Sequence, residues 1–359
     1  MNTERDRVES AFVCLRMRVV DLFAGLGGFT CGALEAGAEV ILVVDADPAP
    51  LKVLAANAPS ATAVLATLGE GRDEVQLPPP ASDLHVHFST PCTELSIARR
   101  GDAKADIEAG LSMIKWAVRL VLGRGDHSWS LEQVPTKATR SLMTELVTAH
   151  PEQISYGVFD SADFGAPQTR LRLIAGPPRL IRTLKAIPSA RHVSIRDAFE
   201  KAGAELPAPR CKNQTRSQAG GEPTMRNVET QSFTVCAGHA LTWCDTAGKT
   251  VRVMTARESA ILMGFPSTWA LPHGSRAAQR AVGNAMCVAL SKAIVRSAIA
   301  VQNGNASVPG EVDTEPTPSP APTEKGEPTY QQYRRLRRRL DNLEKLVYST
   351  MNFGEALED

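Results

Sequence analysis

Apolar and polar residues alternate along the first half of the chain with the periods of strands and helices in turn. Short apolar runs predict strands at residues 18–23, 40–44, 83–88, 128–133, 154–159 and 172–175, and helical spacing is found at 29–36, 49–57, 111–122 and 142–150. Strands that alternate with helices favour an α/β fold with a doubly wound, mostly parallel sheet. Ligands bind such sheets in a crevice at the carboxyl ends of the strands, so we expect the functional residues in the loops there.

The alternation fades beyond residue 177. A region rich in Pro, Arg, Gln and Thr predicts a smaller, less regular domain, and helical periodicity returns at 256–263 and 285–301. The stretch that follows is dense in Pro, Thr, Glu, Gly and Ser, which is typical of a disordered linker. The expected organisation is a catalytic and cofactor-binding domain at 1–177, the smaller domain at 178–252, a return segment at 253–301, the linker at 302–328 and a C-terminal helix at 329–359.

In the C-terminal helix, apolar residues fall at the a and d spacing of a coiled coil, with arginines between them. Two to three heptads are marginal for a coiled coil, so a single solvated helix is as good an interpretation as self-association. A basic helix of this kind could also contact a phosphate backbone.

Composition limits the classes of protein that fit. A chain of 359 residues with 43% hydrophobic residues can bury a large core, in one large domain or two modest ones. The formal net charge of +1 means that any surface for nucleic acid must be a local basic cluster. Seven cysteines without a CxxC pair argue against a zinc module and a disulfide framework, and no apolar run reaches the roughly 18 residues of a membrane span. We expect an intracellular protein without a metal or membrane partner.

A glycine cluster follows the first expected strand, in the run DLFAGLGG at 21–28. Glycines between a strand and a helix let backbone amides approach a ligand closely, and an acid at the end of the next strand can accept ribose hydroxyls. Asp45 fits that role, with Asp47 as a poorer substitute. The pattern is not GxGxxG and no positive charge follows, so a nucleoside without phosphates fits better than a dinucleotide. The alternative is a tight turn with no ligand.

Cys92 follows Pro91 at the exit of another expected strand. A thiol there is a candidate nucleophile, although a Pro-Cys pair is more often a turn followed by a small buried side chain. Order along the chain favours the nucleophile: the glycine run comes first, and LEQVP at 131–135, QTRLR at 168–172 and GNA at 283–285 follow.

Together these segments resemble a DNA (cytosine-5)-methyltransferase of the compact single-chain type. The similarity runs from residue 19 to about 295 and includes PQTRLR at 167–172, TARESAILMGFP at 255–266 and RAVGNAM at 280–286. It implies a Rossmann-like S-adenosylmethionine-dependent methyltransferase fold, in which 178–252 is the target-recognition domain that binds DNA. The implied activity is methyl transfer from S-adenosylmethionine to carbon 5 of a cytosine flipped out of duplex DNA.

The resemblance also implies the residues that do the chemistry. The Cys92 thiolate would add to carbon 6 of cytosine and leave by β-elimination, and Glu132 would share a proton with ring nitrogen 3. Arg172 would hold the cytosine carbonyl oxygen and the nucleophile loop, and Arg170 the Glu132 loop or a phosphate. The implied cofactor contacts are Phe23, Ala24, Gly25, Leu26, Gly27, Gly28, Asp45, Thr67, Pro91 and Asn284, and the implied substrate contacts are Gln168, Ser96, Arg210, Lys212 and Arg216.

Two positions depart from the family's pattern at the cofactor. Ala46 stands where an aromatic residue often stacks on adenine, and Thr67 stands where an acid is expected at the adenine amino group. Both departures bear on cofactor affinity.

Two alternatives keep the same fold: a methyltransferase acting on RNA, and a catalytically silent regulator that binds DNA or a partner. A regulator would be expected to lack Cys92, Glu132 or the paired arginines, and this chain has all of them. The recognised bases, a preference for unmethylated or half-methylated sites, and the biological role are not encoded in these patterns.

Overall fold

A seven-stranded sheet forms the centre of the computed structural model, which describes residues 16–92, 95, 106–213 and 224–304. Its strands lie in the order β3-β2-β1-β4-β5-β7-β6. Their bounds are β1 Arg18–Leu22, β2 Glu39–Asp45, β3 Thr62–Leu65, β4 Leu84–Ser89, β5 Trp129–Gln133, β6 Ser155–Asp160 and β7 Leu171–Gly176. The strands from β3 to β5 pair in parallel, and β7 is antiparallel to both β5 and β6. The expected α/β fold with a mostly parallel sheet is confirmed.

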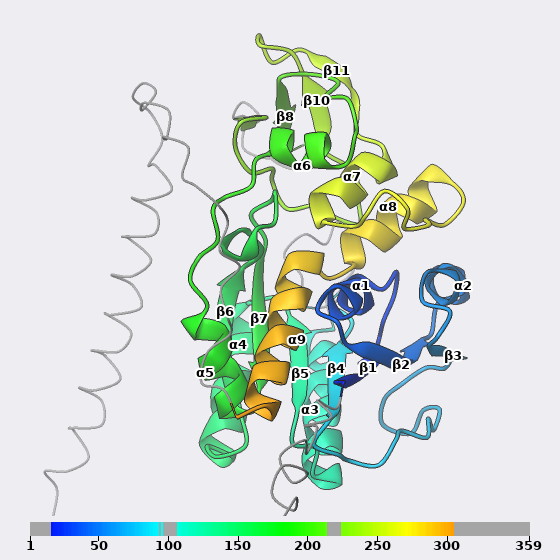
Figure 1. Ribbon diagram of the computed structural model, residues 1–359, viewed down its shortest axis with the longest axis vertical. Coiled ribbons are helices and arrows are strands. Elements are labelled where there is room, and N and C mark those ends of the chain that lie inside the picture. The colour runs from blue at the N-terminus through cyan, green and yellow to red at the C-terminus, as the bar shows by residue number, and fades with distance from the viewer. Residues whose placement is uncertain (1–15, 93–94, 96–105, 214–223, 305–359) are drawn as a thin grey trace, which may run out of the picture. The chain divides into compact units, whose positions relative to one another are not determined.

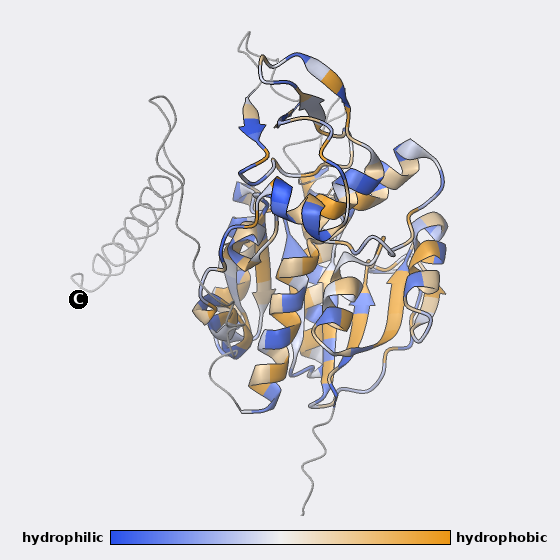
Figure 2. Ribbon diagram, turned by 45° about the horizontal axis from the view of Figure 1, so that its top comes forward, coloured by the Kyte–Doolittle hydropathy of each residue, from blue (hydrophilic) through white to orange (hydrophobic). Residues whose placement is uncertain are grey.

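Helices cover both faces of this sheet. On one face α1 (Gly28–Glu35) and α5 (Pro178–Ala186) flank α9 (Val288–Gln302), and on the other lie α3 (Ile107–Arg124) and α4 (Lys137–Ala149) (Figure 1). Helix α2 (Pro48–Asn57) follows β2, and the 3-10 helix η1 (Ser161–Phe164) follows β6. Figure 2 shows apolar strands behind helices that carry both apolar and polar residues. This pattern is the physical basis of the two expected periodicities.

Helix α5 was expected to fall in the smaller domain. Its Leu180, Ile181 and Leu184 are buried in the same core as α1 and α9, so it packs in the layers of the large sheet. The bounds of the expected target-recognition domain stay a prediction. The predicted C-terminal helix, and the predicted linker beyond Gly304, lie outside the described residues.

A second, antiparallel sheet has the order β11-β10-β8-β9. Its strands are β8 Arg210–Lys212, β9 Met225–Asn227, β10 Thr242–Cys244 and β11 Thr250–Val253, and helix α6 (Ile195–Lys201) precedes them. Trp243 of β10 is fully buried and meets Phe199 of α6 edge to face at 5.5 Å. Three or four residues are too few for a strand period to stand out, which explains why the sequence predicted only an irregular region.

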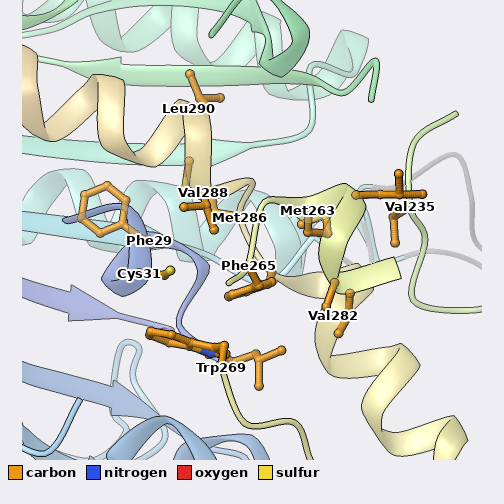
Figure 3. Packing of buried hydrophobic residues seen from close by; sticks show 14 of the residues in the cluster. Phe29, Cys31, Val235, Met263, Phe265, Trp269, Val282, Met286, Val288 and Leu290 are labelled. Carbon is orange, nitrogen blue, oxygen red and sulfur yellow. The ribbon is translucent and has the colours of Figure 1, made fainter. Parts of the chain in front are cut away.

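The return segment forms α7 (Ala256–Met263), α8 (Ser275–Asn284) and α9. Figure 3 shows how it packs: Phe265, Trp269 and Met286 lie in one apolar cluster with Phe29 of α1. The indole nitrogen of Trp269 donates to the carbonyl oxygen of Leu26 at 3.1 Å, which joins the two ends of the described chain at the glycine turn. The stretch Ser275–Gln302 is long and apolar enough to cross a membrane, but 67% of its most apolar window is buried, as in a core helix.

Candidate active site

A cavity of about 520 Å³ opens at the carboxyl ends of β1, β2, β4 and β5. Chain connections run outward in opposite directions from β1 and β4, so this edge is the switch point at which open α/β sheets bind ligands. Among the residues that line it are Phe23, Ala24, Gly25, Leu26, Asp45, Asp47, Pro91, Cys92, Glu132, Arg276, Arg280 and Asn284. The structure therefore brings together residues from both ends of the described chain.

The glycine turn shapes one wall of the cavity. Phe23 adopts a φ of 61° and Gly25 a φ of 53°, and the left-handed region is rare for a residue such as phenylalanine. The N–H group of Gly25 donates to Asp45 Oδ2 at 2.7 Å, which ties the turn to the end of β2. Nothing lies within 4 Å of the position that a Cβ would take on Gly25, so the turn leaves open space there.

Gly27 and Gly28 do not line this cavity. A Cβ on Gly28 would meet the backbone of Met286, so this glycine lets α1 pack closely against the return segment. Gly27 has a φ of 85° and precedes α1. In the structure, Gly27 and Gly28 therefore allow the turn and the close packing of α1, and they do not form the cavity wall.

The acid at the end of β2 lies in the cavity wall. Asp45 accepts N–H groups of Gly25 and Asp47, and burial raises the pKa of its carboxyl. Thr67 does not line the cavity: it is exposed, and its N–H group donates to Asp73 at 2.6 Å. Asn284 and Pro91 do line it.

Three residues, Cys92, Glu132 and Arg172, form what we term the catalytic wall. Cys92 follows β4, Glu132 lies on β5 opposite Ser89 in the register, and Arg172 lies on β7, the next strand. Arg172 Nε and Glu132 Oε1 form an ion pair at 2.6 Å, with both side chains largely buried. The spacing of these residues along the sequence did not predict this ion pair, because the pair depends on β7 lying beside β5 in the sheet.

The surroundings of Cys92 shift the pKa of its thiol in opposite directions. Burial raises the pKa of the Cys92 thiol, and the nearby Glu132 carboxylate raises it further. Arg172 and Arg170 act in the opposite direction and favour the thiolate. The net shift is upward, so Cys92 is a thiol at neutral pH.

Arg170 and Gln168 form a second polar group behind this wall, which we term the buttress. The Arg170 guanidinium is buried and donates to the carbonyl oxygens of Val235, Gly283 and Ala285 at 2.7, 3.1 and 3.0 Å. Burial is the main reason that the pKa of Arg170 is lowered to about 10. The structure therefore places Arg170 on backbone carbonyls and not on the Glu132 loop.

Gln168 lies beside Arg170 in the buttress. Its Nε2 donates to the Leu262 carbonyl at 2.7 Å, and its Oε1 accepts from the N–H group of Val235 at 3.1 Å. Gln168 is fully buried, which differs from the expected substrate contact. Its amide instead ties the segment before β7 to α7 and to the connection between β9 and β10.

The expected substrate residues do not all gather at the cavity. Arg210 and Lys212 lie on β8, where they donate to the carbonyl oxygens of Thr246 and Gly248 at 3.0 and 3.1 Å. Neither lines the cavity. Ser96 and Arg216 lie outside the described residues. Within the described ranges no group of three or more His, Cys, Asp or Glu side chains could hold a metal ion.

Two arginines at the cavity were missed by sequence reasoning. Arg276 and Arg280 line it from α8, and both are exposed. They are four residues apart, and Ala278 and Val282 are buried, so helical periodicity at 275–284 could have found them.

Comparisons with known proteins agree on one class. The C-5 cytosine-specific DNA methylase family matches residues 17–176 and 181–300. Type II methyltransferase M.HgiBI of Herpetosiphon aurantiacus is 31% identical over 44% of this chain and 36% of its own length, so the chain spans about a third of that relative. Type II methyltransferase M.NlaX of Neisseria lactamica is 24% identical over 77% of this chain and 94% of its own length. A prophage-encoded protein of E. coli, described as a DNA modification methyltransferase, shares the fold: it superposes with a TM-score of 0.57 at 16% identity, over 80% of this chain and all of its own.

Proposed function

Because the chain belongs to the C-5 cytosine-specific DNA methylase family, we propose that it transfers a methyl group from S-adenosylmethionine to carbon 5 of cytosine in duplex DNA. The observation that carries this proposal is that Cys92 and Glu132 line the same cavity as the glycine turn. A nucleophile, a proton-sharing carboxyl and a cofactor cradle in one cavity are the parts that this reaction requires.

The residues around the cavity fit S-adenosylmethionine. Its size of about 520 Å³ falls within the ~300–1,000 Å³ of small-molecule sites. The open space over Gly25, the Phe23 ring and the Asp45 carboxylate would hold the nucleoside end, and Asn284 lines the same cavity. When bound, the cofactor supplies an electrophilic methyl group on a sulfonium. The exposed Ala46 adds no ring to this pocket, so adenine stacking would depend on Phe23.

Cys92 would start the reaction by adding to carbon 6. Addition makes carbon 5 electron-rich, and it needs the thiolate, which burial disfavours in the protein without DNA. Arg172 and Arg170 favour the thiolate, and pairing of Glu132 with the base would remove part of the charge that opposes it. DNA binding would thus activate the nucleophile.

Glu132 would share a proton with ring nitrogen 3, which relieves the negative charge that addition places on the ring. Its ion pair with Arg172 orients the carboxyl group, because a 2.6 Å contact to Nε restricts one of its two oxygens. The second oxygen then remains for the base. Arg172 would act both as this support and as a donor to the cytosine carbonyl oxygen.

Access to carbon 6 requires that the cytosine leave the duplex, since a stacked base cannot enter a pocket. We assign recognition of the surrounding DNA to the small sheet and its loops, with α8 and its two arginines at the cavity mouth as a phosphate contact. An enzyme with this substrate acts inside the cell.

The proposal is tested by mixing the protein with labelled S-adenosylmethionine and unmethylated duplex DNA. We expect methyl transfer, and loss of turnover in Cys92→Ser. Bisulfite sequencing of the product DNA would identify the target site in the same experiment. Robust transfer by Cys92→Ser would overturn the mechanism.

Two parallel reactions separate the alternatives. Transfer to folded RNA but not to duplex DNA would assign the same chemistry to RNA. Tight DNA binding without transfer to either nucleic acid would identify a silent regulator.

A further inference from the structure

A chain of hydrogen-bonded Ser and His side chains, buried at its centre, runs along β4 and β5. Ser130 Oγ is hydrogen-bonded to His85 Nε2 at 2.8 Å and to His87 Nδ1 at 2.7 Å. The outer nitrogens of the two rings reach Ser128 Oγ at 2.8 Å and Ser89 Oγ at 2.9 Å. The side chains therefore form one unbroken sequence of hydrogen bonds, Ser128, His85, Ser130, His87 and Ser89, which we term the Ser-His chain.

The two ends of the Ser-His chain lie in different surroundings. Ser89 lines the cavity that also contains Cys92 and Glu132, and Ser89 is the register partner of Glu132. Ser128, at the other end, is partly exposed and follows the exposed His127. His85 and Ser89 are four residues apart on a strand, so the chain crosses roughly 13 Å of the interior.

Between these ends every link is shielded from solvent. His85, His87 and Ser130 are fully buried, and the Phe29 ring of α1 stacks on His87 at 3.5 Å between centroids. Burial lowers the pKa of His85 to about 3 and that of His87 well below its ordinary value, so both rings are neutral. A neutral imidazole has one donor and one acceptor nitrogen, and a hydroxyl can serve as either. Each ring can therefore accept a proton on one side and release one on the other.

Two carboxyl groups lie beside the Ser-His chain in the sheet. Asp21 of β1 is the register partner of His87, and Glu132 follows Ser130 by two residues on the same face of β5. One oxygen of Asp21 accepts from Thr30, and the other is buried without a hydrogen-bond partner. Burial raises the pKa of Asp21 to about 7. Neither group interrupts the hydrogen bonds of the chain.

The proposed reaction releases one proton in each turnover. Carbon 5 exchanges a hydrogen for a methyl group, so a neutral cofactor product, a methylated base and one proton are formed. That proton leaves carbon 5 when its C–H electron pair forms the C5–C6 double bond and the C6–S pair returns to Cys92. With DNA over the open face of the cavity, the proton needs a route through the protein.

We propose that the Ser-His chain conducts this proton from the cavity to solvent. The proposal rests on the proposed function. A water molecule in the cavity takes the proton from carbon 5 and passes it to Ser89. Each link then accepts one proton and donates another, until Ser128 releases one to solvent. Both imidazole rings are neutral after the transfer, and each hydrogen bond of the chain then points in the opposite direction. Rotation of the hydroxyl groups and exchange of the two histidine tautomers restore the original directions.

The variant that tests the relay most sharply is His85→Gln. A glutamine amide can hydrogen-bond to both Ser128 and Ser130, so packing and polar partners are kept, but it cannot pass a proton on. Ser130→Ala breaks the chain at its centre as a second variant. His150→Gln, the same exchange in a half-buried histidine at the end of α4, is the matched control.

Single-turnover and steady-state assays with labelled cofactor and cytosine DNA separate methylation from proton removal. In His85→Gln we expect methylation to proceed while the covalent Cys92 adduct accumulates and steady turnover falls about tenfold, with recovery when small imidazole buffers are added. His150→Gln should match the unmodified protein. Unchanged turnover in His85→Gln would overturn the relay, as would equal loss of methylation and turnover without recovery by buffer.

A measurement without DNA or cofactor tests the Ser-His chain separately from methyl transfer. Nitrogen-15 NMR of labelled histidine should show both tautomers in exchange at His85 and His87, and a single tautomer at His87 in Ser130→Ala. Fixed tautomers in the unmodified protein would contradict the relay even if methyl transfer occurs. Exchange without any methyl transfer would reject the proposed function, and with it the assignment of this proton to the Ser-His chain.

Discussion

The catalytic wall and the buttress are built from similar residues a few positions apart, yet they have different partners. In the wall, Arg172 pairs with Glu132 at the edge of a cavity. In the buttress, Arg170 is buried and donates to three backbone carbonyls from distant parts of the chain. Residue type and spacing therefore select candidate residues, whereas the partners show which arginine pairs with Glu132 and which one holds the backbone.

The two regions also depend on each other. The buttress carbonyls belong to residues 235, 283 and 285, and Asn284 between them lines the cavity. Arg170 thus fixes the return segment against the sheet so that Asn284 reaches the cavity. We interpret Arg170 as a positioning residue and Arg172 as a catalytic one.

The largest expected effect is on folding, from Arg170→Met. Loss of the guanidinium leaves three buried carbonyls without a charged donor, and we expect the free energy of unfolding to fall by about 4 kcal/mol. Arg172→Met is the comparison variant: activity should be lost, and the free energy of unfolding should fall by about 2 kcal/mol, because the Glu132 carboxyl left behind lines the cavity and can be hydrated there. Chemical denaturation of both variants measures this difference, and equal destabilisation would remove the distinction between wall and buttress.

The next effect is on catalysis, from Glu132→Gln. The amide keeps the shape of the side chain but loses the ability to share a proton, so kcat/KM should fall about 10²- to 10³-fold. Glu258→Gln is the matched control, because Glu258 is a capping residue of α7 paired with Arg252, and it does not line the cavity. Its rate should stay near that of the unmodified protein. A similar rate loss in both variants would indicate general destabilisation.

Smaller effects on stability and on cofactor binding should distinguish alanine substitutions at Gly25 and Gly28. Gly28→Ala should lower the free energy of unfolding by about 2 kcal/mol, because its Cβ would meet the Met286 backbone. Gly25→Ala has room for its Cβ and should cost about 1 kcal/mol through its positive φ, while it weakens cofactor binding. Calorimetric titration with S-adenosylmethionine and denaturation distinguish the two. Undiminished cofactor binding by Gly25→Ala would argue against a ligand over this turn.

The smallest effect is the pH dependence of Cys92. Because burial raises the pKa of the thiol, alkylation by iodoacetamide in the absence of DNA should be slow at pH 7 and still rising above pH 9. In Arg172→Met the rise should move to higher pH, because Arg172 favours the thiolate. Peptide mass spectrometry of Cys92 follows both. A plateau below pH 8 would show that the loop stabilises the thiolate.

Much of the fold could be predicted from the sequence, because its information is local. Periodicity at 83–88 and 128–133 placed β4 and β5, and parallel strands bring their carboxyl ends to one edge. The resemblance to the family assigned Cys92 and Glu132 as a pair, and this edge of the sheet explains why both line one cavity. Four strands of the small sheet were missed because each has only three or four residues.

The remaining features depend on contacts between segments far apart in the sequence. The partners of Arg170 lie 65 to 115 residues away, so no local pattern could assign it to the buttress. Thr67 was expected at the cofactor by position in the motif order, but the loop before β4 turns it toward Asp73. The two rings of the Ser-His chain look like ordinary strand positions until the register of β4 and β5 is known.

The most direct test of the central claim is covalent trapping by duplex DNA that contains 5-fluorocytosine at the target site. Fluorine at carbon 5 cannot leave as a proton would, so the adduct between Cys92 and carbon 6 persists after methyl transfer. We expect a stable complex of protein and DNA that requires S-adenosylmethionine, with the DNA attached to the peptide that contains Cys92, and no complex with Cys92→Ser. Attachment to another residue, or tight binding with no adduct, would contradict the account.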